Sequence, residues 1–297
     1  MNETTDVIIN FTPTGMIPTN EMTPHVPITP SEIIEQVHQA AEIGITMVHL
    51  HAREEDSGQP CWQAEVYRRI IEGIRDFSRD LIICVSLSGR NYSEFEKRTD
   101  VLLLDGDLKP DMGSLTLSSV NFNRIASINS PAMIQKLAGA MKEKGILAEL
   151  EAFDSGMINY AKYLEHKNLL EPPHYFNLLL GNVACAQANL LHAGIMINDL
   201  PENSVWSMAG IGDAQVAVNT MAIAAGGGVR VGLEDNIWWD SRRTRLATNA
   251  ELVSRVHRIA NDIGRSIMTP EEGRKLLNLQ PGNGLYGRLF PSGQGWV

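Results

Sequence analysis

Short apolar, β-branched stretches alternate along the chain with longer segments of helical periodicity, about eight times in all. The predicted strands are 7–14, 47–53, 81–89, 112–122, 147–156, 175–182, 205–212 and 229–235. Buried strands that alternate with amphipathic helices are typical of a parallel sheet. About eight such units without a long linker favour closure into a (β/α)₈ TIM barrel. A doubly wound open sheet is the alternative.

The predicted helices carry recognisable start signals. Thr29 is expected to cap the first helix, with Pro30 at its first position and Glu32 completing a capping box. Further helices are predicted over 64–78 and from about 130, 249 and 269. No second domain or internal repeat is visible, so we expect one barrel domain over 1–297.

Residues 280–297 are expected to form an ordered C-terminal tail that extends the barrel. The tail contains five large apolar residues, namely Leu285, Tyr286, Leu289, Phe290 and Trp296. They pack either on their own barrel or on a neighbouring subunit, and the sequence leaves both possibilities open.

Composition narrows the class of protein. The 297 residues suit one α/β barrel, and a net charge of −10 disfavours a nucleic-acid partner. No apolar run approaches the roughly 18 residues that a membrane span needs, and the acidic, polar start lacks the basic region of a signal peptide. The three scattered cysteines fit a reducing compartment. We therefore expect a cytoplasmic protein.

Two histidines on the second predicted strand are the strongest chemical signal. His49 and His51 are two residues apart, so both side chains point to the same face, which should be the barrel interior. Two imidazoles in an apolar interior are costly without partners, and a divalent metal would bind both. Glu234, at the end of the last predicted strand, is the best placed third ligand. Two imidazoles, a carboxylate and an open position are typical of catalytic zinc, although manganese or iron would accept the same ligands.

Other polar residues occupy the strand ends, where barrels place their chemistry. Arg230 shares a face with Glu234, and Asp235 follows at the end of the strand. Arg230 and Asp235 form either a structural salt bridge or a functional dyad. Glu149 and Glu151 share a face, and Glu151 is the better candidate for chemistry because it is nearer the rim. Neutral hydrogen-bonding groups come from Ser86, Ser88, Ser114 and Thr116.

The segments TPTG, PITPSEI, VHLHAR, ELEAFDSG, MAGIG and VRVGLEDN occur in this order along the chain. In these segments, from about Val7 to about Leu276, the chain resembles the β-keto acid cleavage enzymes. The resemblance implies a (β/α)₈ barrel that binds Zn²⁺ through His49, His51 and Glu234. It also implies a reaction in which a β-keto acid and acetyl-CoA give acetoacetate and a new acyl-CoA, and a homo-oligomer, with a tetramer favoured.

The resemblance also implies roles for individual residues. Arg230 and Asp235 look like a proton-transfer dyad, with Glu151 as a second acid near the reacting carbon. The contacts with substrate that it implies come from Ser86, Gly89 and Ser114. In the resulting hypothesis Asp235 removes the α-proton, Arg230 stabilises the substrate carboxylate, and the carbanion attacks the thioester before a retro-Claisen step releases acetoacetate.

Some positions depart from the family pattern and bear on the substrate. Ile17 stands where members that act on an amino-bearing keto acid have an acid. We therefore expect uncharged or anionic β-keto acids to be preferred. For coenzyme A, the predicted phosphate contacts are Arg242 or Arg243, in the loop after the last strand, with Arg90 nearby.

Two other classes of protein remain as alternatives. Amidohydrolase barrels also carry a His-x-His pair, but on the first strand and with further histidines after strands five and six. Here strand five ends AFDSG and strand six ends LLLGN, and neither end has a histidine. A catalytically silent metal- or metabolite-binding barrel is the third possibility.

Overall fold

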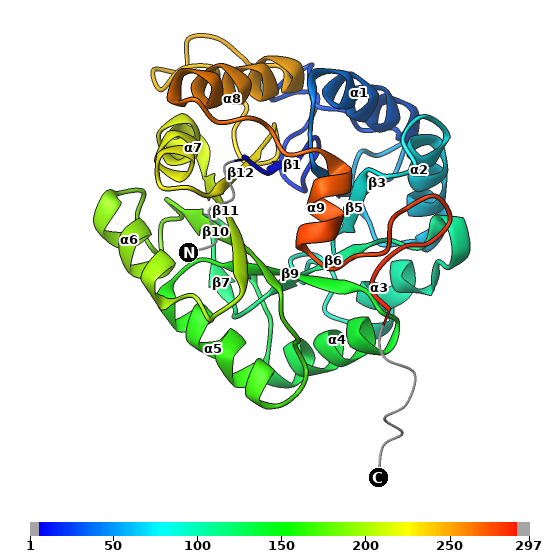
Figure 1. The fold of residues 1–297 in the computed structure, drawn as a ribbon. Coiled ribbons are helices and arrows are strands. Elements are labelled where there is room, and N and C mark those ends of the chain that lie inside the picture. The colour runs from blue at the N-terminus through cyan, green and yellow to red at the C-terminus, as the bar shows by residue number, and fades with distance from the viewer. Residues whose placement is uncertain (1–5, 290–297) are drawn as a thin grey trace.

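The sheet is a closed ring of parallel strands in the order β1-β12-β11-β10-β9-β6-β5-β2 (Figure 1). This computed structural model describes residues 6–289. The barrel strands are β1 (Ile9–Phe11), β2 (Met47–Leu50), β5 (Ile82–Val85), β6 (Met112–Thr116), β9 (Leu147–Ala152), β10 (His174–Leu180), β11 (Ser204–Gly210) and β12 (Gly228–Val231). The predicted TIM barrel is therefore confirmed, and the open sheet is excluded.

Most of the helices form an outer ring around the strands (Figure 1). They are α1 (Pro30–Ile43), α2 (Ala64–Phe77), α3 (Phe95–Thr99), α4 (Pro131–Glu143), α5 (Ser155–His166), α6 (Leu190–Asp199), α7 (Gln215–Ala224), α8 (Asn249–Ile263) and α9 (Pro270–Leu276). The connection from β5 to β6 has only the short α3 and the 3₁₀ turns η1 (Asp100–Leu103) and η2 (Gly106–Leu108). A third 3₁₀ turn, η3 (Gly212–Ala214), precedes α7.

The predicted helix start at Thr29 is confirmed. Its side chain accepts a hydrogen bond from the backbone of Glu32, whose carboxylate returns to the Thr29 backbone N–H. Thr248 with Glu251, and Thr269 with Glu272, cap α8 and α9 in the same way. Each box satisfies backbone donors that a helix leaves without an intrahelical partner.

The strands end earlier than the sequence predicts, because the apolar pattern continues past the last ladder hydrogen bond. The predicted strand 112–122 is wrong beyond Thr116. The chain leaves the barrel there and forms a hairpin of β7 (Val120–Asn121) and β8 (Ala126–Ser127). Likewise, β3 (Ala52–Arg53) pairs with β4 (Pro60–Cys61) and not with the barrel. These departing segments form the rim of the barrel.

The opposite end of the barrel is closed by apolar side chains and one buried carboxylate. Met268, Leu277 and Leu279 pack against the inward-facing residues of the strands, and α9 lies across this end in Figure 1. Asp111 accepts hydrogen bonds from Arg75 and from Arg274 at 2.8–3.0 Å. The backbone N–H groups of Ile83 and Gly287 also donate to it. One carboxylate thus joins four separate segments.

The described part of the predicted tail lies against its own barrel. Tyr286 is buried beneath the Arg75 guanidinium, 3.8 Å from its ring centroid. Arg288 donates to the backbone oxygens of Leu277 and Glu171. Leu285 and Leu289 are exposed. The other two apolar residues of the predicted tail, Phe290 and Trp296, lie outside the described residues.

None of the helices within residues 6–289 is long and apolar enough to cross a membrane. Cys61, Cys84 and Cys185 are free thiols.

Candidate active site

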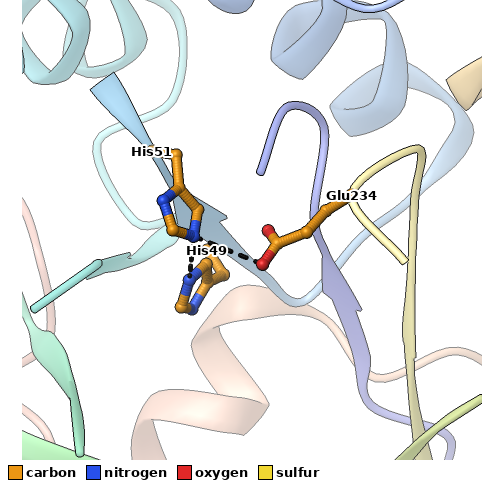
Figure 2. A group of neighbouring side chains, drawn as sticks. All are labelled: His49, His51 and Glu234. Atoms are coloured by element: carbon orange, nitrogen blue, oxygen red, sulfur yellow. Dashed lines mark hydrogen bonds and ion pairs between the residues drawn. The ribbon is translucent and has the colours of Figure 1, made fainter. Parts of the chain in front are cut away.

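His49 and His51 converge at the carboxyl end of β2. Their Nε2 atoms are 3.2 Å apart, and Nε2 of His51 lies 3.2 Å from Oε1 of Glu234 (Figure 2). Both imidazoles are buried. The strand parity expected from the sequence therefore brings the two rings to one point, and the chain that follows β12 brings the carboxylate to meet them. This grouping of side chains could hold a metal ion.

Glu149 lies deeper in the barrel than the pocket and is hydrogen-bonded to the ring of His49. Its Oε2 lies 2.6 Å from Nδ1 of His49, and its Oε1 accepts hydrogen bonds from the side-chain amides of Asn10 and Asn177. Burial would raise the pKa of this carboxyl, but the neighbouring His49 outweighs burial and lowers the pKa to about 2. The ionised Glu149 fixes a proton on Nδ1 and leaves the lone pair of Nε2 facing the rim, as in histidine metal sites.

Sequence reasoning missed this role of Glu149, since Glu149 and Glu151 have the same parity on β9. Only depth in the barrel separates them: Glu149 is fully buried, and Glu151 lies on the pocket wall. A charged residue in the first half of a buried strand, far from the rim, is the signal that could have found it.

The loop after β1 fits closely over Glu234. Gly15 has φ +65°, and a Cβ atom added there would lie 2.5 Å from Cγ of Glu234, so only glycine fits. Buried Arg53 fixes this loop by donating to the carbonyl oxygens of Gly15 and Pro18. This packing explains why the TPTG segment and the HLHAR segment belong to the same site.

Arg230 binds three carboxylates at once. It donates to Glu234 at 2.6 Å, to Glu151 at 3.2 Å and to Asp235 at 3.2 Å. Each of its three nitrogens is engaged, so it does more than the single salt bridge to Asp235 considered from the sequence. This arginine positions all three acids of the site.

Asp235 and Glu151 complete the polar group around Arg230. Burial, with the adjacent Glu234, raises the pKa of Asp235 to about 6 even though Arg230 acts in the opposite direction. Thr12 donates to Asp235 at 3.4 Å, and Thr116 donates to Glu151 at 2.7 Å. A carboxylate with a pKa near neutrality is suited to proton transfer.

These groups lie in a rim pocket of about 640 Å³. Much of the wall is apolar, and the polar lining includes most of the residues that the sequence singled out. Of those predicted residues, the pocket is lined by His51, Ser86, Ser88, Thr116, Glu151, Arg230, Glu234 and Asp235. Ile17 and Arg90 also line it.

Two residues predicted to contact substrate lie behind the wall of this pocket. Ser114 is buried and its Oγ accepts a hydrogen bond from the backbone of Leu87. Gly89 packs so closely that a Cβ atom there would lie 2.8 Å from the carbonyl oxygen of Ile128. Neither residue is among those that line the pocket, so their contact with the substrate stays a prediction.

The arginines predicted for coenzyme A are exposed and do not line the pocket. Arg243 pairs with Asp213 at 3.0 Å. The backbone N–H of Arg242 donates to Asp240. Asp213 follows Gly212, which does line the pocket, so the Arg243 loop adjoins the pocket on the β11 side.

Within residues 6–289, no further histidine joins His49, His51 and Glu234, as an amidohydrolase site would require. His174 is at the start of β10, at the opposite end of the barrel, and faces Glu165 at 3.2 Å. His192 lies in α6 and accepts a hydrogen bond from the backbone of Gln187. Neither belongs to the group formed by His49, His51 and Glu234.

A closed (β/α)₈ barrel with acids, histidines and a deep pocket at the carboxyl ends of its strands defines an enzyme of the TIM-barrel class. The sequence profile of the beta-keto acid cleavage enzymes matches residues 6–279. The chain therefore belongs to the β-keto acid cleavage enzyme family, which confirms the resemblance, and it is a β-keto acid:acetyl-CoA transferase-type enzyme.

Several relatives match nearly the whole chain. A 3-keto-5-aminohexanoate cleavage enzyme of Fusobacterium nucleatum subsp. nucleatum is 36% identical over 92% of this chain and 98% of its own. A 3-oxoadipate:acetyl-CoA acetyltransferase of Cupriavidus necator is 34% identical over 92% and 94%. A 3-dehydrocarnitine:acetyl-CoA trimethylamine transferase of Rhizobium meliloti is 32% identical over 92% and 97%. Their names differ in the keto acid.

Solved structures show the same fold. The protein ObcA, in a ternary complex with a C4-CoA adduct and oxalate, superimposes with a TM-score of 0.74 at 22% identity, over 86% of this chain and 68% of that one. An N-acetylneuraminic acid synthetase of Leptospira borgpetersenii gives a TM-score of 0.51 at 10% identity, over 91% and 89%.

Proposed function

We propose that this chain is a zinc-dependent β-keto acid cleavage enzyme. It condenses a β-keto acid with acetyl-CoA and releases acetoacetate and a new acyl-CoA. The observation that carries the proposal is the convergence of His49, His51 and Glu234 on one point of the rim pocket, in a chain of this family.

The donor atoms fit a metal ion better than they fit one another. Ligands about 2.0–2.1 Å from a tetrahedral zinc lie roughly 3.3 Å apart. The separation of the two Nε2 atoms, and that of His51 Nε2 from Glu234 Oε1, are both 3.2 Å. Oε2 of Glu234 is buried and has no hydrogen-bond partner among the described residues. Two histidines and one carboxylate would hold zinc and leave a position for substrate.

When bound, Zn²⁺ would supply Lewis-acid polarisation of the keto and carboxylate oxygens of the substrate. The chain's own residues do the rest. Glu149 keeps the His49 ring in one orientation and one tautomer. Arg230 fixes Glu234, Asp235 and Glu151 in one array, which supports a positioning role for this arginine.

Asp235 is the proposed base that removes the proton between the keto and carboxyl groups. Its carboxylate lines the pocket, and its orientation is fixed by Arg230 and Thr12. Glu151, hydrogen-bonded by Thr116 on the same wall, is the second acid near the reacting carbon. The carbanion then attacks the acetyl-CoA thioester, the thiolate of CoA takes the acyl group of the original keto acid, and acetoacetate leaves. The exchange conserves both acyl groups and needs no oxidant.

Coenzyme A is proposed to lie at the pocket mouth with a phosphate near Arg242 or Arg243. The exposure of both arginines and their place beside the pocket support this arrangement. A homo-oligomer is also proposed, a tetramer by the resemblance. The apolar side chains of Leu190 and Leu191, which are 75% and 70% exposed on α6, suit a subunit contact. Light scattering on the purified protein measures the oligomeric mass.

Turnover with a panel of β-keto acids tests the reaction. Each acid is incubated with and without acetyl-CoA, and acetoacetate and acyl-CoA are measured by mass spectrometry. We expect acetoacetate and the matching acyl-CoA in equal amounts, and neither without acetyl-CoA. Product formation independent of CoA would support a hydrolase instead.

A further inference from the structure

Besides Arg230, two arginines line the pocket, namely the exposed Arg124 and the half-buried Arg90, and neither forms an ion pair within residues 6–289. Arg90, in the loop after β5, lines the pocket, and its Cζ lies 3.8 Å from the ring centroid of Phe122. Its Nε atom is buried and has no hydrogen-bond partner in the part of the chain that the structure describes. Within residues 6–289, no acid forms an ion pair with it.

Arg230, unlike Arg90, is surrounded by the acids of the pocket. The acids that line the pocket are Glu151, Glu234 and Asp235, and all three bind Arg230. Glu234 and Glu151 act on Arg90 only at a distance, so its guanidinium has no direct ion pair within residues 6–289. A partly desolvated charge without a partner is unfavourable, and an anionic ligand would relieve it.

The loop that carries Arg90 is hydrogen-bonded at Leu87 to two neighbouring segments. Leu87 donates to Ser114 Oγ at 3.0 Å and accepts from Arg98 Nε at 2.8 Å. Phe122 directly follows β7 in the β7–β8 hairpin, whose Asn121 carbonyl accepts a hydrogen bond from the side-chain amide of Asn182. The guanidinium is thus positioned before any ligand arrives, which lowers the entropic cost of binding.

We propose that Arg90 binds the distal carboxylate of a β-keto dicarboxylic acid, so that diacids are the preferred substrates. This inference rests on the proposed function, in which the β-keto acid end of the substrate lies at His51 and Glu234. The remaining lining, with Ile17, Met22 and Leu179, contains no free acid that could pair with a substrate ammonium. A planar carboxylate matches the fork of a guanidinium, and the half-buried site favours a small anion over a hydrated phosphate.

A matched pair of substrates tests the inference. 3-Oxoadipate and 3-oxohexanoate have the same chain length and differ in the distal carboxylate. The wild type should prefer 3-oxoadipate in kcat/KM. Arg90→Gln should lower kcat/KM for 3-oxoadipate by about 10- to 100-fold, as expected for a hydrogen bond to a charged group. It should change 3-oxohexanoate by less than about twofold and leave KM for acetyl-CoA unchanged. Arg90→Lys should restore part of the preference.

A binding measurement separates this inference from the proposed reaction. Adipate has no keto group and cannot turn over, so its affinity is measured directly by calorimetry. Adipate should bind the wild type and bind Arg90→Gln at least about 10-fold more weakly. If no keto acid reacts, the proposed function fails, but loss of adipate binding still supports the carboxylate site.

Two variants serve as controls. Arg69→Gln removes the same charge from an exposed position on α2 and should leave adipate affinity unchanged. Arg124→Gln removes an exposed arginine from the hairpin turn of the same pocket. The inference is overturned if Arg124→Gln causes the loss and Arg90→Gln does not, or if Arg90→Gln lowers activity equally for both keto acids. A rise in KM confined to acetyl-CoA would assign Arg90 to a phosphate and also overturn it.

Discussion

Glu149 lies directly beneath His49, with 2.6 Å between its Oε2 and the Nδ1 of the imidazole. The two residues come from β2 and β9, which are separated in the ring by β5 and β6, and both are buried in the barrel interior. Because Asn10 and Asn177 fix the other carboxylate oxygen, the position of the His49 ring is set by side chains from three strands. The metal-binding side chain of His49 is therefore held in position by residues deeper in the barrel.

This contact predicts that Glu149→Gln weakens metal binding without removing a ligand. The amide is neutral and cannot hold the Nδ1 proton as firmly, so we expect about 10- to 100-fold lower affinity for Zn²⁺. Competition with a chromogenic chelator measures the affinity. Glu165→Gln, which alters the contact with His174 at the other end of the barrel, is the control and should bind zinc like the wild type. Equal affinities in the wild type and Glu149→Gln would contradict the role of Glu149.

Removing a proposed ligand has a larger effect. The purified protein should contain about one zinc per chain, and His49→Ala or His51→Ala should lose both the metal and the activity. Elemental analysis after dialysis measures the content. Thr116→Val, on the same wall but outside the ligand group, should retain zinc. A folded double histidine variant that still binds zinc stoichiometrically would disprove the assignment.

At the other end of the barrel, Asp111→Asn should lower the free energy of unfolding by about 3 kcal/mol or more, because Arg75 and Arg274 would be left buried without a charge partner. Burial disfavours the charged form of Asp111, but the two arginines outweigh burial and lower its pKa. The contribution to stability is then full above the unfolded pKa of about 3.9 and is lost as the pH falls through the lower folded pKa.

Urea unfolding from pH 7 to pH 3 checks both statements. The difference between wild type and Asp111→Asn should stay constant down to about pH 5 and narrow below about pH 4. Asp80→Asn, on the exposed turn nearby, should follow the wild type. A difference that does not depend on pH would show that the charge of Asp111 is not what stabilises this end.

Ile17 provides a test of substrate charge. It lines the pocket and is 51% exposed, so a polar replacement there should be tolerated. Ile17→Glu should raise kcat/KM for 5-amino-3-oxohexanoate relative to 3-oxohexanoate, by about fivefold or more, since a carboxylate would then face the ammonium group. Ile17→Gln is the uncharged control. A wild type that already prefers the amino substrate would count against the expectation based on Ile17.

The exposed arginines beside the pocket give the last prediction. Replacing both Arg242 and Arg243 with Gln should raise KM for acetyl-CoA about threefold or more and reduce its dependence on salt. Zinc content and the affinity for adipate should not change. Replacing both Arg68 and Arg69 with Gln on the outer surface of α2 is the charge-matched control. An unchanged KM for acetyl-CoA at low ionic strength would show that neither arginine contacts coenzyme A.

The barrel was predictable because its strands are apolar runs separated by helices with clear caps, as at Thr29. The ends of the strands were not. The N–H of Leu117 still donates to the Glu151 carbonyl of β9, but residues 118–122 have no ladder partner in the barrel and lead into a hairpin instead. The pattern records burial, which continues into the rim loops, and it does not record which strand supplies the hydrogen bonds.

The active site could likewise be predicted only in part from the sequence. His49 and His51 could be paired from their spacing, because strand parity is local. The ion pair between Arg230 and Glu151 could not be predicted, since Glu151 comes from β9 and its distance from Arg230 depends on closure of the barrel. Ser114 has the polarity of a substrate contact, but its depth directs its hydroxyl to the backbone of Leu87.

Asp111, together with Leu277 and Leu279, ties the chain together at the end of the barrel opposite to the chemistry. The residues that face the substrate, Ile17 and Arg90 among them, are in loops at the other end. Replacement of these loop residues during evolution leaves the closure of the ring untouched. A lineage with this architecture can therefore exchange one keto acid for another through a few substitutions, while it inherits the same scaffold.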